Sequence, residues 1–154
     1  MDYTVLKWLH ILSSTVLFGT GLGSAYYMFF VSLTGDARAA AAVMRYVVRA
    51  DWWFTTPTII FQPLSGFYLA QLAGYPLTTA WIAYSVALYL LALACWLPVV
   101  WIQVRMRDLA CQAALEARAL PARYRYFLRW WIALGTVAFF AFVAVFYLMV
   151  AKPA

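Results

Sequence analysis

Four long apolar segments dominate the chain, at residues 3–33, 52–73, 81–104 and 130–150, and short polar stretches separate them. About 20 apolar residues in helical form cross the hydrocarbon core of a bilayer. The pattern therefore predicts an all-α protein, an integral membrane four-helix bundle that forms a single transmembrane domain over residues 1–154. The first segment is longer than a crossing requires, so we expect it to tilt or to project from the membrane.

Composition supports this prediction, because 68% of the 154 residues are hydrophobic and only 10% are charged. A soluble domain contains about half apolar and a quarter charged residues. The chain begins Met-Asp-Tyr without a basic leader region, so we expect the first helix to be retained.

Arginine marks two of the three loops. Cytoplasmic loops carry an excess of basic residues, so we expect both arginine loops in the cytoplasm and both termini outside (N-out, C-out), in a bacterial inner membrane. The basic residues then indicate contact with anionic membrane lipid rather than with nucleic acid. They are Arg38, Arg45 and Arg49 in the first loop, and Arg105, Arg107, Arg118, Arg123, Arg125 and Arg129 around the third.

These two loops also carry helical signals. Residues 36–49 are rich in alanine behind Asp36, a residue type that caps helix N-termini, and this predicts a short cytoplasmic helix. Residues 105–120 are expected to continue the third span as helix until Pro121 ends it. Asp51, directly before the second apolar segment, is expected to cap that helix or to pair with an arginine, in either case a structural role. Cys95 and Cys111 show no disulfide or metal-site spacing.

His10 is the only histidine in the chain, and it lies inside the first apolar segment. Ionisable groups at membrane depth are costly and are often functional. Two interpretations remain open. The imidazole is hydrogen-bonded to a neighbouring serine, glutamine or carbonyl, or it is itself a metal ligand or a proton-transfer group. If iron is bound, His10 is one axial ligand, and the second is Met149, His10 of another protomer, or absent. Gly19 and Gly23 form a notch that suits either a neighbouring helix or a porphyrin face.

The whole chain resembles an uncharacterised family of small bacterial integral membrane proteins, a domain of unknown function. The matching segments are KWLHILSSTVLFGTGLGSA, ADWWFTTPTIIFQPLSG, WLPVVWIQVRMRD and FYLMVAKP. The first segment, with its K-x-x-H-I pattern followed by glycine, also resembles HemJ-type protoporphyrinogen oxidases and copper-resistance D-type membrane domains. The HemJ-type resemblance implies haem b at His10 and oxidation of protoporphyrinogen IX. Those enzymes also rely on a lysine in a later helix, whereas here no lysine lies between Lys7 and Lys152.

The leading hypothesis is therefore a haem b-binding membrane redox protein, a haem-dependent oxidoreductase with a porphyrin or a quinone as its partner. It would bind haem through His10, with Met149 and the Gly19–Gly23 notch as further candidate cofactor contacts, and would act as a homo-oligomer or within a larger membrane complex. The alternative is a non-catalytic accessory or assembly subunit of such a complex. A transporter is less favoured, because the four predicted spans contain no carboxylate.

Overall fold

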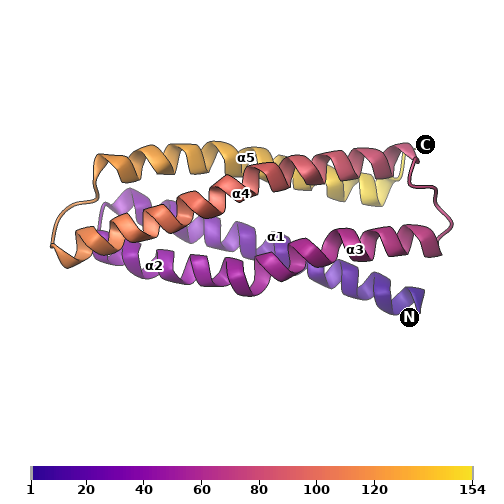
Figure 1. Ribbon diagram of the computed structural model, residues 1–154, viewed down its shortest axis with the longest axis horizontal. Coiled ribbons are helices and arrows are strands. Elements are labelled where there is room, and N and C mark those ends of the chain that lie inside the picture. The colour runs from indigo at the N-terminus through magenta and orange to yellow at the C-terminus, as the bar shows by residue number, and fades with distance from the viewer. Residues whose placement is uncertain (1, 154) are drawn as a thin grey trace.

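The protein is all-helical in the computed structural model, which describes residues 2–153 and contains no strand among them (Figure 1). This confirms the all-α part of the predicted fold class. The helices, in chain order, are α1 (Tyr3–Thr34), α2 (Ala37–Ala50), the π-helical turn η1 (Asp51–Thr55), α3 (Thr56–Leu72), α4 (Ala80–Leu115) and α5 (Ala122–Ala151).

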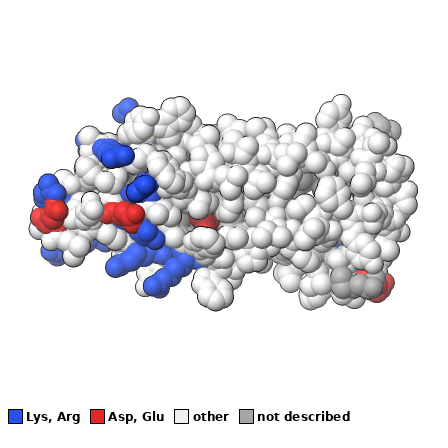
Figure 2. Space-filling model, viewed as in Figure 1, with Lys and Arg blue, Asp and Glu red and all other residues white. Residues whose placement is uncertain are grey.

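The helices lie roughly along one axis, and α4 crosses the molecule diagonally, from beside α5 at one end to beside α2 at the other (Figure 1). Both termini and the α3–α4 loop lie at one end, which we call the terminal end. The α1–α2 and α4–α5 loops lie at the other end, and most Lys and Arg side chains gather there (Figure 2). We call it the arginine end.

One unbroken helix runs from Ala37 to Leu72, because α2, η1 and α3 follow one another with helical backbone angles at each junction. Its start is the predicted one: the Asp36 side chain accepts hydrogen bonds from the amides of Arg38 and Ala39. The expected N-cap at Asp51 is wrong, because no helix begins there. Asp51 instead opens the π-helical turn, in which the backbone takes up one extra residue per turn.

The third apolar helix continues past the membrane segment, as predicted, but it ends at Leu115 rather than at Pro121. Ala117 adopts a left-handed conformation with φ of 50°. The amide of Arg118 then bonds to the carbonyl of Ala113, and that of Ala117 to the carbonyl of Ala114. This pair of bonds is the Schellman termination, which satisfies the last carbonyls of the helix.

The buried core lies toward the arginine end. Small residues of α2 and α4 allow close approach there, and four large side chains have almost no exposure. The Tyr124 hydroxyl and the Ser32 hydroxyl share a hydrogen bond of 2.7 Å, which joins α5 to α1. The four large buried side chains are Met28, Met44, Met106 and Tyr124.

Three helices, α1, α4 and α5, are long and apolar enough to cross a membrane. At about 1.5 Å per residue, the 32 residues of α1 extend roughly 48 Å, well beyond the ~30 Å hydrocarbon core. The remaining predicted span, residues 52–73, corresponds to η1 and α3, and its crossing of the membrane stays a prediction. The concentration of basic residues at one end (Figure 2) is the pattern behind the predicted orientation, which also stays a prediction.

Candidate functional site

His10 lies where α1 packs against α3. Its Nδ1 atom is 2.7 Å from the Ser65 hydroxyl oxygen. That hydroxyl also lies 2.7 Å from the main-chain carbonyl of Phe61, one turn earlier in α3, which is a second possible acceptor for its one proton. When the hydroxyl donates to Phe61, Ser65 accepts from His10 and the imidazole carries its proton on Nδ1.

The tautomer determines which nitrogen can bind another group. With the proton on Nδ1, the Nε2 atom bears the lone pair, and it has no hydrogen bond among residues 2–153. Histidines that bind metals are commonly held in this way, with one ring nitrogen donating to a protein oxygen and the other facing the metal. The arrangement therefore satisfies both interpretations of the sequence: the imidazole is hydrogen-bonded, and one nitrogen is left for a ligand or a proton.

Two further α3 residues shape the surroundings of the imidazole. Gln62 donates from its side-chain amide to the main-chain carbonyl of His10, over 3.0 Å, which fixes the two helices at this level. Gly66 lies beside the ring, since a Cβ atom at this position would lie 3.4 Å from His10 Cε1, at van der Waals contact. The imidazole therefore lies in close contact with α3.

The predicted glycine notch lies away from the imidazole. Gly19 and Gly23 line a groove of about 430 Å³ between α1 and α2, and neither His10 nor Met149 borders it. Each glycine has open space where a Cβ would be, so no other helix of this chain occupies the notch. Met149 lies near the C-terminus of α5, and 37% of its surface is exposed. The structure thus separates the glycine notch from the imidazole.

A set of several protein ligands to a bare metal ion is absent from the described part of the chain, where no three His, Cys, Asp or Glu side chains come together. Cys95 and Cys111 are free thiols. A haem iron requires only one or two axial side chains, because the porphyrin supplies the other four ligands.

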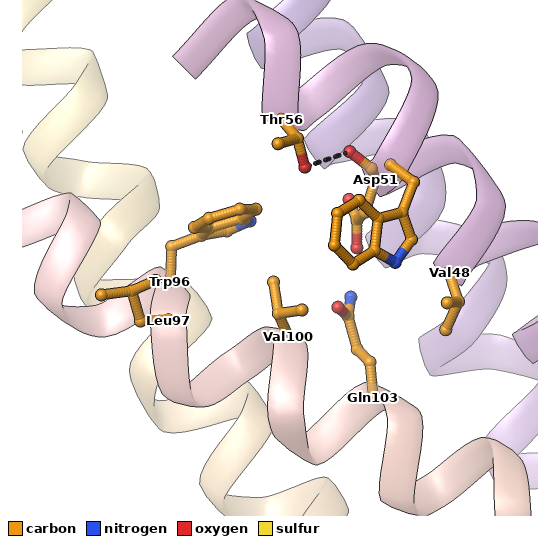
Figure 3. Close-up of a pocket in the computed structure, with 8 residues that line it drawn as sticks. Val48, Asp51, Thr56, Trp96, Leu97, Val100 and Gln103 are labelled. Atoms are coloured by element: carbon orange, nitrogen blue, oxygen red, sulfur yellow. Dashed lines mark hydrogen bonds between the residues drawn. The ribbon is translucent and has the colours of Figure 1, made fainter. Parts of the chain in front are cut away.

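A second polar site, which the sequence did not indicate, lies between η1 and α4. Asp51 and Gln103 face a cavity of about 270 Å³, together with Thr56, Trp96 and apolar neighbours (Figure 3). Asp51 is only 6% exposed and Gln103 only 5%. The predicted pairing of Asp51 with an arginine is not found among the described residues. The Thr55 hydroxyl donates to Oδ1 of Asp51 over 2.9 Å, and the Gln103 side chain lies within hydrogen-bonding reach of the same carboxylate.

Sequence comparison supplies the family but no activity. No curated protein and no solved structure matches the chain. A family model does match, over residues 4–153, and its description is a predicted integral membrane protein (DUF2269). Because the match covers nearly the whole chain, the protein belongs to this family of integral membrane proteins, DUF2269.

Proposed function

We propose that the protein is a haem b-binding membrane redox protein in which Nε2 of His10 is an axial ligand to the iron. The observation that supports this most is the hydrogen bond of 2.7 Å between His10 Nδ1 and the Ser65 hydroxyl. It orients the ring and, with the proton on Nδ1, leaves the lone pair on Nε2. A neutral imidazole held by such a partner is the usual protein ligand to haem iron.

The chain's own residues would hold and tune the group. Ser65 keeps the proton on Nδ1, Gln62 fixes the His10 main chain, and Gly66 lies beside the ring. A bound haem would supply one-electron chemistry, and the apolar surroundings and the axial ligands would set its potential. The second axial position would be taken by Met149 or by His10 of a second copy, or would stay open.

The proposed partner of the redox reaction is a porphyrin or a quinone. A quinone suits an apolar helical protein because it dissolves in the bilayer, and a porphyrin is what the HemJ-type resemblance of the first helix implies. We place the protein in the bacterial inner membrane, with the arginine end in the cytoplasm. Since only 6% of the most apolar stretch of α5 is buried within the chain, lipid, a second copy or a larger complex would cover its remaining surface.

The test is an absorption spectrum of the protein purified in detergent after haem-supplemented expression, oxidised and then reduced with dithionite. We expect a Soret band and a sharpened α-band on reduction, both lost or shifted in His10→Ala. Met149→Leu is the companion variant: a changed reduced spectrum identifies the second ligand, and an unchanged one favours His10 of a second copy or an open position. A colourless wild-type protein would refute the proposal and favour the accessory-subunit alternative.

A further inference from the structure

A buried carboxylate and a buried amide face the same cavity near the arginine end of the molecule. In Figure 3 the Asp51 and Gln103 side chains point into one space between η1 and α4. One carboxylate oxygen of Asp51, Oδ2, has no hydrogen-bond partner among the described residues, and neither has Oε1 of Gln103. Both atoms are hydrogen-bond acceptors, and the Gln103 amide lies within reach of the carboxylate, so a further donor placed between the two side chains would satisfy both oxygens.

The carboxylate also lacks a counter-charge. The ion pairs of residues 2–153 involve Asp108 and Glu116, not Asp51. The two arginines nearest in sequence to Asp51 and Gln103 lie against aromatic rings instead: Arg49 is 6.0 Å from the ring centre of Tyr46, and Arg105 is 5.4 Å from that of Trp101. Because a buried charge without a partner is costly, the cavity favours a positively charged occupant.

The rest of the cavity is apolar and aromatic. Trp52 and Trp96 contribute indole rings, and Val48, Leu97 and Val100 complete the wall. Aromatic faces attract cations, and indole does so most strongly. A volume of about 270 Å³ is far larger than a single metal ion needs and has room for an organic group. Trp52 is 64% exposed, so this wall reaches the molecular surface, where a ligand can enter.

We propose that the Asp51–Gln103 cavity is a binding site for a hydrophobic organic ammonium ion. The ammonium group donates to Asp51 Oδ2 and to Gln103 Oε1, and the apolar part of the ligand lies against Trp52 and Trp96. The π-helical turn contributes because it places Asp51 at a break in the regular helix, a backbone feature frequent at functional sites. The site is independent of His10, which contacts α3 through Ser65.

The test is isothermal titration of the detergent-purified full chain with phenethylammonium, and with 2-phenylethanol as its uncharged counterpart. We expect saturable binding of the amine and at least about tenfold weaker binding of the alcohol, since a hydrogen bond to a charged group is stronger than a neutral one. Asp51→Asn keeps the shape and removes the charge, and should weaken the amine at least tenfold. Asp108→Asn is the matched control, because Asp108 pairs with Arg107 outside the cavity and its loss should change nothing.

Retained amine affinity in Asp51→Asn would overturn the proposal, and so would the lack of saturable amine binding by the wild-type chain. Gln103→Leu is the second variant and should weaken the amine several-fold while the helical circular dichroism stays unchanged. His10→Ala should leave amine binding intact, so that a failure of the haem proposal and a failure of this one are distinguished. Equal affinity for the alcohol would also count against an ammonium site.

Discussion

Replacing Ser65 by alanine should change which nitrogen of His10 carries the proton. Among residues 2–153, Ser65 supplies the only side-chain hydrogen bond of the imidazole, 2.7 Å from Nδ1, and it is itself buried. The substitution removes this acceptor and leaves the helix intact, because alanine favours helix more than serine does. With the partner gone, the proton is expected to distribute between Nδ1 and Nε2.

The expected change in the tautomer ratio follows from the free energy of the one hydrogen bond that is lost. A neutral hydrogen bond contributes about 0.5–1.5 kcal/mol net, and about 1.4 kcal/mol corresponds to a tenfold change in an equilibrium constant. We therefore expect the ratio of the Nδ1–H to the Nε2–H form to fall by about two- to tenfold in Ser65→Ala. If haem binds, its affinity should fall too, by roughly 10- to 100-fold at most, as for other partners of metal-binding histidines.

Nitrogen-15 NMR of histidine-labelled protein measures the tautomer directly, and it needs no assignment because the chain has one histidine. Ser14→Ala is the control: Ser14 lies one turn from His10 on α1, but its hydroxyl donates to the carbonyl of Ile11. An unchanged tautomer ratio in Ser65→Ala, or an equal change in Ser14→Ala, would refute the assignment of the proton to Nδ1.

Three other predictions concern packing. Tyr124→Phe should lower the free energy of unfolding by about 1 kcal/mol, because one neutral hydrogen bond to Ser32 is lost. SDS titration in mixed micelles measures this free energy, and a loss above about 3 kcal/mol would contradict the prediction. Met106→Ala should cost about 2–5 kcal/mol in the same assay, because a fully buried side chain leaves a cavity, and a neutral result would place Met106 outside the core. Gly66→Ala should preserve the His10 NMR signal, whereas Gly66→Leu should displace the ring and change it, because the added Cβ is already 3.4 Å from Cε1; equal spectra would contradict the close contact.

Much of the fold follows from local rules that the sequence displays. The helical class follows from long apolar segments. The start of α2 follows from Asp36, whose side chain accepts hydrogen bonds from the amides two and three residues further along the chain. Such interactions involve residues adjacent in the chain, so no knowledge of the tertiary structure is needed to predict them.

The departures arise where tertiary contacts decide. Asp51 has the residue type and position of an N-cap, but the helix continues through it and its carboxylate bonds to Thr55, in a turn that takes up an extra residue. The early end of α4 depends on a left-handed Ala117, and alanine gives no signal of the kind that glycine gives at such a position. Sequence patterns could therefore place the helices but not these two backbone irregularities.

The two polar sites differ in how far they could be foreseen, and the difference has a physical basis. His10 is conspicuous because a lone ionisable group inside an apolar segment contrasts with its own neighbours. Asp51 and Gln103 each lie within two residues of an arginine, where polar side chains are ordinary in a membrane protein. Only the packing of α2 against α4, next to η1, removes both from solvent and brings them to one cavity, although they are 52 residues apart in the chain. A polar residue at the boundary of an apolar segment can therefore be recognised as unusual only when the fold shows that it is buried. Here the buried group is the Asp51 carboxylate, which has no counter-charge.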